Sequence, residues 1–294
     1  MIELERITKK YSTAVALDGV NASIKDHRIV TFVGPNGAGK TTLIKILSTE
    51  LYPSEGRAFV LGYDVVKEAK DLRTLIAIVP QEADPEPDLT PMEHIKYYLW
   101  ARGFSRTQAA SRAKETLEDL DLWDRRNITA NKLSGGFRRR ILIGMALATD
   151  AELIFLDEPT VALDPVARRL TWDLLSSIKD RRFVLTTHYM DEAEALSDEI
   201  IFINEGRIVA QGSSKDLLGT LGFDIKVVVD MEAYECMKFF SERVISHGNQ
   251  SLIYTTDPKA VGEKLLSMDV PFRIERVTLE DFFFLKVGGK DEQT

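Results

Sequence analysis

The sequence predicts an α/β fold built around a parallel sheet, followed by a small α+β domain. Short apolar runs rich in β-branched residues alternate with longer helical patterns, which is the rhythm of βαβ units. Several of these runs are apolar on both faces, as strands of a buried parallel sheet are. A glycine-rich motif, 34–42, lies between a predicted strand and a predicted helix, the context of a phosphate-binding P-loop.

Five runs are predicted as strands and five segments as helices. The strands are 29–33, 75–79, 153–156, 183–187 and 200–203, and the helices are 40–48, 90–102, 107–120, 135–149 and 164–179. The acidic, proline-rich stretch 82–91 reads as a loop that leads into an inserted, mainly helical block of about 90–131.

A second boundary is predicted near 213–222, where a short helix precedes a glycine. It divides a domain at 1–215 from a C-terminal domain at 220–294, a plausible size for an independent unit. The C-terminal strands are expected at 223–229, 251–256 and 272–277, and the helices at 232–244, 258–268 and 279–287. The aromatic run 282–285 is interpreted as a core face rather than a docking surface.

Composition restricts the function classes. The 294 residues are 44% hydrophobic and 29% charged, with a net charge of −8, so wholesale binding to nucleic acid phosphates is disfavoured. The single cysteine, Cys236, is expected to be an ordinary structural residue in a reducing compartment. We expect no signal peptide, and no stretch approaches the roughly 20 apolar residues that cross a bilayer. A role at a membrane would therefore require a docking partner.

The P-loop motif predicts phosphate binding for physical reasons. Its glycines permit backbone angles that turn successive N–H groups inward, and the following helix N-terminus favours anions. Lys40 would reach the β- and γ-phosphates, and the Thr41 hydroxyl would coordinate Mg²⁺. The residues expected to bind ATP here are Gly34, Pro35, Asn36, Gly37, Ala38, Gly39, Lys40, Thr41 and Thr42. The motif alone leaves a kinase, a GTPase and a transport motor open.

Two carboxylates end the apolar run 153–156. Asp157 would emerge at the carboxyl end of the sheet, where ligands of open α/β sheets bind, and could hold Mg²⁺. Glu158 points a different way and is placed to polarise a water aimed at the γ-phosphate. Read in isolation, the pair could equally be a solvated acidic strand end.

The motif Leu133-Ser134-Gly135-Gly136 lies 24 residues before Asp157. Ser134 is a good N-cap, and the two glycines expose N–H groups at a helix start. In this order and spacing the motif resembles the signature of ABC ATPases. The resemblance implies that this loop binds the γ-phosphate held by the opposite subunit.

Further positions extend the resemblance over about residues 1–215. Tyr11 resembles the aromatic residue that stacks on adenine, and Gln81 resembles the Q-loop glutamine that contacts Mg²⁺ and senses the transport partner. Asp164 lies in a segment that resembles the D-loop. His188 resembles the switch histidine that contacts the γ-phosphate. Together with Lys40 and Glu158, His188 is expected to be catalytic, and the metal site is expected to comprise Thr41, Gln81 and Asp157.

The sequence departs from the family pattern at two places. Phe137 stands where the signature usually has glutamine, and Val161-Ala162 replace a polar and small pair in the D-loop. These changes remove a possible polar contact across the subunit interface and stiffen the D-loop. They concern the coupling between the two ATP sites of a paired ATPase. They do not change the lysine, the glutamate or the residues expected to hold Mg²⁺.

The resemblance implies a Mg²⁺-dependent ATPase with a P-loop core, an N-terminal antiparallel β subdomain and an inserted helical subdomain. It also implies head-to-tail pairing with a second nucleotide-binding subunit, as a homodimer or heterodimer. The motifs near the switch and the C-terminus are similar to those of drug, polysaccharide and lipid exporters, daunorubicin-resistance ATPases included. A separate transmembrane permease is then the expected partner, with this chain bound peripherally at the cytoplasmic face of the cell membrane.

Three alternatives stay open at this point. A soluble ABC ATPase acting on DNA or the ribosome is disfavoured, because only 51 residues separate Gln81 from Leu133 and there is a single ATPase unit. A nucleotide-binding regulator with no transport role is disfavoured, because every residue type expected for catalysis is present. An importer ATPase is the third alternative. We expect no nucleic acid partner, and the transported substrate is not encoded in this chain.

Overall fold

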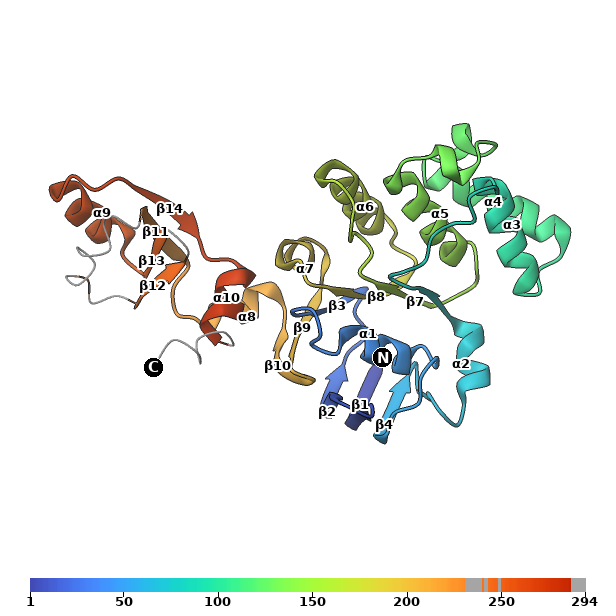
Figure 1. Cartoon of the computed structure of the whole chain (residues 1–294), viewed down its shortest axis with the longest axis horizontal. Coiled ribbons are helices and arrows are strands. Elements are labelled where there is room, and N and C mark those ends of the chain that lie inside the picture. Colours follow the sequence, from blue (N-terminus) through green and yellow to red (C-terminus); the bar gives the residue numbers. More distant parts are fainter. Residues whose placement is uncertain (231–239, 241–242, 248–249, 287–294) are drawn as a thin grey trace. The chain divides into compact units, whose positions relative to one another are not determined.

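The computed structural model describes residues 1–230, 240, 243–247 and 250–286. The chain divides into two units, Met1–Gln211 and Gly212–Thr294 (Figure 1). The helix α8 (Ser214–Gly219), which lies at the predicted boundary, belongs to the second unit. In the described part of the chain, no helix is both long enough and apolar enough to cross a membrane.

The larger sheet of the first unit has six strands in the order β10-β9-β3-β8-β7-β6. The bounds are β3 (Ile29–Val33), β6 (Ile76–Val79), β7 (Leu153–Asp157), β8 (Arg182–Thr187), β9 (Glu199–Asn204) and β10 (Arg207–Gly212). The pairs β3–β8, β3–β9, β6–β7 and β7–β8 are parallel, which confirms the predicted parallel sheet. One boundary prediction is wrong: Leu75 ends the helix α2 (Ala69–Leu75) and is not part of the strand.

A four-stranded antiparallel sheet, in the order β2-β1-β4-β5, forms the second sheet of this unit. Its strands are β1 (Ile2–Lys10), β2 (Val15–Ile24), β4 (Glu55–Val60) and β5 (Tyr63–Asp64). The helix α1 (Lys40–Leu47) lies between the two sheets (Figure 1). Its buried side chains Leu43, Ile44, Ile46 and Leu47 join both sheets in one core.

Helices cover the other face of the parallel sheet (Figure 1). They are α5 (Gly135–Leu147), α6 (Pro165–Ser177) and α7 (Met190–Leu196). The inserted block contains α3 (Pro91–Ala101) and α4 (Arg106–Asp119), which form a small core with α5. Thr90 and Ser105 begin α3 and α4 with capping boxes, in which side chain and backbone satisfy each other's free groups.

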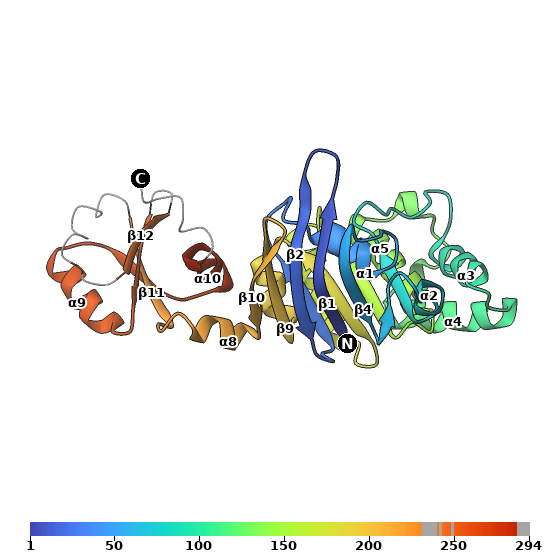
Figure 2. The same cartoon turned by 90° about the horizontal axis from the view of Figure 1, so that it is seen from below.

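The described part of the second unit contains a four-stranded sheet in the order β12-β13-β11-β14. Its elements are β11 (Ile225–Asp230), β12 (Arg243–His247), β13 (Gln250–Thr255), α9 (Pro258–Ser267), β14 (Phe272–Arg276) and α10 (Leu279–Lys286). The helices α9 and α10 cover opposite faces of this sheet (Figure 2).

Two of the predictions for the second unit concern a helix end and an aromatic run. The predicted helix 232–244 is wrong at its end, because Arg243 and Val244 belong to β12, where they pair with β13. The earlier part of that prediction, with Cys236, lies outside the described residues. The expectation that the run 282–285 provides a core face is confirmed for Phe282 and Leu285, which are 3% and 6% exposed.

Candidate functional site

The P-loop follows β3 and opens α1, and two of its glycines have no room for a side chain. A Cβ on Gly34 would lie 2.0 Å from the carbonyl oxygen of Ile203. Gly39 has φ of 104°, and a Cβ there would lie 2.5 Å from the carbonyl oxygen of Ala16. Both positions therefore need glycine for close packing of the loop against its neighbours, in addition to the nest geometry that phosphate binding requires.

A cavity of about 320 Å³ lies over this loop. Its lining comprises Ala16, Asn36, Gly37, Gly39, Lys40, Thr41, Thr42, Gln81 and Glu158. The lining does not include the loop residues Gly34, Pro35 and Ala38. The carbonyls of Gly34 and Pro35 accept hydrogen bonds from the Lys40 ammonium, and the carbonyl of Ala38 accepts one from the N–H of Gly206. The cavity thus combines the loop's N–H groups, a cation and a carboxylate.

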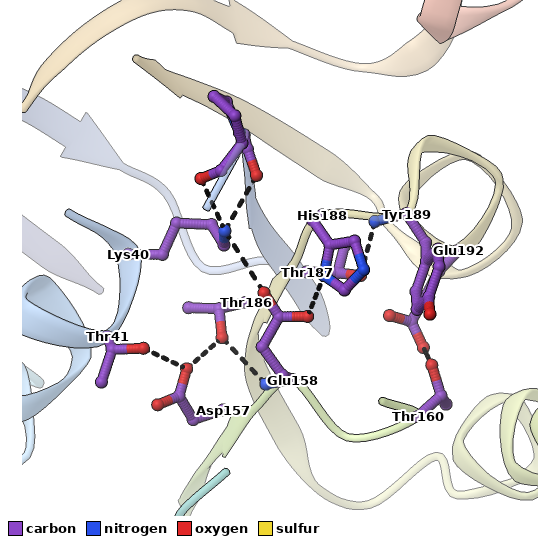
Figure 3. A network of polar contacts seen from close by, with 12 residues as sticks. Lys40, Thr41, Asp157, Glu158, Thr160, Thr186, Thr187, His188, Tyr189 and Glu192 are labelled. Carbon is purple, nitrogen blue, oxygen red and sulfur yellow. Dashed lines mark hydrogen bonds and ion pairs between the residues drawn. The ribbon is translucent and has the colours of Figure 1, made fainter. Parts of the chain in front are cut away.

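Lys40, Glu158 and His188 form a chain of polar contacts at the edge of the cavity (Figure 3). The Lys40 ammonium lies 3.2 Å from Glu158 Oε1, and Nδ1 of His188 lies 2.8 Å from Glu158 Oε2. Lys40 and Glu158 are 5% and 4% exposed, so their attraction is screened little by water. Each oxygen of the Glu158 carboxylate therefore has its own partner, which fixes the orientation of the group.

Asp157 lies beside this chain and contacts hydroxyl groups from two elements (Figure 3). Its Oδ1 accepts hydrogen bonds from Thr41, at 3.2 Å, and from Thr186, at 2.5 Å. The Thr41 hydroxyl and the Asp157 carboxylate are hard oxygen donors of the kind that Mg²⁺ prefers. Among the described residues, no group of three or more His, Cys, Asp and Glu side chains is placed to hold a metal ion. A metal here would therefore need ligands from a nucleotide or water.

The Glu158 backbone adopts the left-handed conformation, with φ of 48°, which is unfavourable for a residue with a side chain. Its N–H donates to the Thr186 hydroxyl at 3.0 Å. Its carbonyl accepts from the Arg139 guanidinium at 3.4 Å. Contacts on both sides of the residue thus hold a conformation that the chain would otherwise avoid.

Arg139 connects α5 with two other segments through backbone carbonyls. It lies on α5 and donates to the carbonyls of Asp157, Glu158 and Pro159, at 3.1, 3.4 and 2.8 Å. It also donates, at 3.3 Å, to the carbonyl of Pro80, the residue before Gln81. Burial lowers the pKa of Arg139 to about 10, while the charges of Asp157 and Glu192 oppose that change.

Glu192 is a second buried carboxyl group near the site. Burial raises the pKa of Glu192, against the effect of hydrogen bonds from Thr187, Thr160 and Trp172. The Thr160 hydroxyl and the Trp172 indole N–H both donate to Glu192 Oε1, at 2.7 and 2.8 Å. Because Thr160 lies two residues after Glu158, this group anchors the turn that carries Glu158.

The signature residues line a separate cavity of about 180 Å³. Ser134 and Gly136 share it with Asp164 and with Phe137, and it contains none of the P-loop residues. Ser134 occupies the N-cap position of α5, but its side chain makes no capping hydrogen bond, so the predicted cap is wrong in that respect. Asp164 caps α6 instead, accepting from the backbone of Val166 and Ala167.

The two departures from the family pattern have local structural roles. The Phe137 ring lies between guanidinium groups, with Arg125 at 4.2 Å and Arg140 at 5.4 Å from its centroid. Such cation–π contacts are worth roughly 0.5–1 kcal/mol each at exposed sites. Ala162 has φ of 60°, so the D-loop turns through a left-handed residue that has a side chain.

Tyr11 and Gln81 are the predicted residues that make few contacts. Tyr11 lies in the β1–β2 hairpin, 49% exposed, with Lys9 over its ring at 5.5 Å. It does not line the cavity over the P-loop, whereas Gln81 does. Stacking of Tyr11 on adenine therefore stays a prediction.

Four residues of this site were missed from the sequence. They are Ala16, Thr186, Arg139 and Glu192. Glu192 follows the switch segment, and Thr186 is the second-last residue of the predicted strand 183–187. Their position near the carboxyl edge of the sheet was therefore a usable signal. Arg139 is one of three consecutive arginines, and the sequence does not distinguish the buried one.

Fold and cavity together define a nucleotide-binding protein of the P-loop class. Comparison with known proteins narrows this class. The model of the ABC transporter family matches residues 17–161. A daunorubicin resistance ATP-binding protein of Streptomyces coeruleorubidus is 38% identical over 79% of this chain and 74% of its own length. A Nod factor export ATP-binding protein I of Burkholderia thailandensis is 31% identical over 99% of this chain and 98% of its own length.

Solved structures agree with these relatives. A dimeric ATP-binding cassette in a post-hydrolysis state, bound to ADP and Pi, has a TM-score of 0.65 and 28% sequence identity. That match covers 72% of this chain and 98% of the cassette. An ATP-binding subunit of an ABC transporter has a TM-score of 0.65 with 26% identity, over 76% of this chain and 93% of its own. The chain belongs to the ABC transporter family, and it is an ATP-binding and ATP-hydrolysing member.

Proposed function

We propose that this chain is the ATPase subunit of an exporter whose membrane-spanning part is a separate polypeptide. The observation that carries the proposal is the Glu158 carboxylate, held between Lys40 and His188 at the edge of the phosphate cavity. The relatives named for drug resistance and for Nod factor export support the direction of transport.

ATP would bind with its phosphates on the P-loop N–H groups, with Lys40 reaching the β- and γ-phosphates. Thr41 and Asp157 would hold Mg²⁺, with Gln81 near it, and the ion would neutralise charge on the phosphates. In the structure the Lys40 ammonium contacts Glu158 and the carbonyls of Gly34 and Pro35. A γ-phosphate would compete with Glu158 for this cation and leave one carboxylate oxygen free.

The freed oxygen of Glu158 would accept a proton from the attacking water. His188 would hold the other oxygen and contact the γ-phosphate, so the direction of the base is fixed during the reaction. The carboxylate needs no rearrangement of its backbone, because Thr186 and Arg139 already hold the left-handed turn at Glu158. This is preorganisation of a general base.

A second nucleotide-binding subunit would complete each site. Ser134, Gly135 and Gly136 line or border a cavity apart from this chain's own P-loop, and Ser134 and Gly135 are exposed. The free Ser134 hydroxyl and the N-terminus of α5 are suited to bind the γ-phosphate of the partner's ATP. The dimeric cassette among the solved relatives supports this arrangement.

The membrane partner would dock on the helical insert and the Q-loop region at the cytoplasmic face of the membrane. The exposed side chains of Tyr97 and Trp100 on α3 form a ring pair at 5.2 Å, an aromatic surface suited to such an interface. Purification from native membranes should yield a complex with a membrane protein. Recovery with nucleic acid or ribosomes instead would support the soluble ABC reading, and solute uptake by the complex would support an importer.

Replacing Glu158 by Gln tests the catalytic assignment. The amide keeps the shape of the side chain but accepts no proton, so we expect ATP turnover to fall by about 10²- to 10⁴-fold with ATP binding retained. The variant should accumulate a dimer that forms only when ATP is present. Size-exclusion chromatography with light scattering measures the rise in the dimer fraction on adding ATP, at a protein concentration where the nucleotide-free chain is mostly monomeric.

Glu152→Gln provides a matched control just before the opposite end of β7, where the side chain is 54% exposed. That variant should turn over ATP like the unmodified protein. Full turnover by the Glu158→Gln variant would show that another group acts as the base.

A further inference from the structure

The strand β14 is an edge of the C-terminal sheet and is unusually open. In the described part of this unit it pairs with β11 alone. Four of its five residues are exposed, and the apolar side chain of Ile274 is 52% exposed. An open edge with an exposed aliphatic side chain is a template for pairing with another strand.

The backbone register shows which groups point outward. Val277 donates its N–H to the carbonyl of Asp224 on the β11 side, just beyond the pair Ile225–Arg276. In an antiparallel ladder, hydrogen-bonded residues alternate with residues whose N–H and C=O point the other way. Phe272, Ile274 and Arg276 therefore present their backbone donors and acceptors along the open edge.

The sequence of β14 is complementary to itself when two copies run antiparallel about Ile274. In that register Arg273 lies opposite Glu275 of the second copy, and the same pair recurs by symmetry. The two Ile274 side chains lie opposite each other, and Phe272 lies opposite Arg276, which allows a cation–π contact. Each cross-strand position is therefore favourable, and none places like charges together.

The charge row extends into the sheet. Lys226 on β11 is the register partner of Glu275, with its ammonium 3.8 Å from the carboxylate. A second copy would add its Arg273 on the open side of the same carboxylate, giving a row of alternating charges. Arg273 and Glu275 already lie 3.6 Å apart within one strand, and their side chains are 63% and 44% exposed.

We propose that the C-terminal units of two copies of this chain join through β14, which would make one continuous sheet across a two-fold axis. Charged residues on an edge strand usually prevent such pairing. Here the charges are of opposite sign and are placed symmetrically about Ile274, so the second copy satisfies them. The contact needs no nucleotide, and it goes beyond the ATP-dependent pairing of the P-loop units.

Charge reversal in the full-length protein tests this register. Sedimentation in nucleotide-free buffer with chelator excludes the ATP-dependent dimer and reports the β14 contact. The unmodified chain should dimerise. Arg273→Glu and Glu275→Arg should each weaken dimerisation by about tenfold or more, because each creates two like-charged pairs. The double variant restores opposite charges across the two-fold axis and should recover most of the affinity. The arginine introduced beside Lys226 keeps it below that of the unmodified chain.

A cross-link tests the two-fold position. Directly opposite residues in a hydrogen-bonded pair have Cα atoms about 5.5 Å apart, within the range of a disulfide. Ile274→Cys in a Cys236→Ser background should form a disulfide-linked dimer under mild oxidation. Leu266→Cys on α9, which is 68% exposed, is the matched control and should stay largely uncross-linked.

Either of two results would overturn the proposal. One is a nucleotide-free chain that stays monomeric at every concentration tested. The other is a dimer whose affinity is unchanged by the single charge reversals. Neither sedimentation without nucleotide nor the cross-link depends on ATP. Loss of the ATP-dependent dimer, or failure of the exporter assignment, would leave both measurements unchanged and can therefore be told apart from failure of this proposal.

Discussion

Replacing Arg139 by Met should reduce ATP turnover much more than it reduces stability. Methionine is unbranched and apolar, so it fills much of the same space and removes the four hydrogen bonds that Arg139 donates. Two of these bonds, to Pro159 and Asp157, are short, at 2.8 and 3.1 Å. Hydrogen bonds from a charged donor contribute roughly 1.5–3 kcal/mol each, so their loss costs about 3–6 kcal/mol.

The desolvation of the guanidinium offsets part of that cost. Burial lowers the pKa of Arg139 from its ordinary value to about 10. Each tenfold change in the protonation equilibrium is worth about 1.4 kcal/mol, so this lowering corresponds to a cost of roughly 3 kcal/mol for keeping the buried guanidinium charged. The methionine variant does not have this cost. The free energy of unfolding should therefore fall by only about 0–3 kcal/mol, which leaves a protein of ordinary stability folded.

Turnover depends on geometry that methionine cannot maintain. Without Arg139, the carbonyls around Glu158 lose their donor, and the left-handed turn at this residue loses support on one side. We expect kcat to fall by about tenfold or more, since a small misplacement of a catalytic group is costly, with KM for ATP nearly unchanged. Steady-state ATPase assays and urea unfolding of the same preparations measure the two effects.

Two further variants complete this test. Arg139→Lys keeps the charge but not the planar fork, so it should recover only part of kcat. Arg169→Met, at a side chain 67% exposed on α6, should leave turnover and stability nearly unchanged. A normal kcat in folded Arg139→Met protein would refute the positioning role.

Two other buried groups give predictions for stability. Because burial raises the pKa of Glu192, its ionisation in the folded state is penalised as pH rises above the ordinary value of 4.5. The urea midpoint of Glu192→Gln, compared with that of the unmodified protein, should therefore be higher at pH 8 than at pH 5. The same difference in midpoint at pH 5 and pH 8 would contradict this prediction. Asp281→Ala should lower local stability in the C-terminal unit by about 3–5 kcal/mol, because Lys226 loses a partner 2.8 Å away. Hydrogen exchange of β11 and β13 measures this loss, and unchanged protection would argue against it.

Much of the parallel sheet was predictable, because buried parallel strands have a local signature. The strand 29–33 was predicted at its observed bounds, since all five residues are apolar or β-branched and all are buried. The strands of the antiparallel sheet were not located individually. In β1 the register to β2 shifts between Leu4 and Ile7 and again beyond Ile7, which breaks the alternation that identifies an amphipathic strand.

The grouping of the site residues was predictable where it depends on short motifs and was missed where it depends on packing. Lys40, Asp157 and Glu158 lie in motifs, and the structure brings them together. The left-handed backbone at Glu158 and the buried guanidinium of Arg139 have no local signal. They arise because α5 packs on the strand that ends at Asp157, a contact between segments about 20 residues apart.

This packing also connects the segment before Gln81 to the turn after Glu158 through one side chain. The Arg139 guanidinium donates to the Pro80 carbonyl at 3.3 Å and to the Pro159 carbonyl at 2.8 Å, so the segment before Gln81 and the turn after Glu158 share one donor group. Because the guanidinium is planar and rigid, moving one acceptor changes the angle at the others. A partner that displaces the Q-loop would weaken the longer bond to Pro80 first. It would then alter the support of Glu158 without touching the nucleotide.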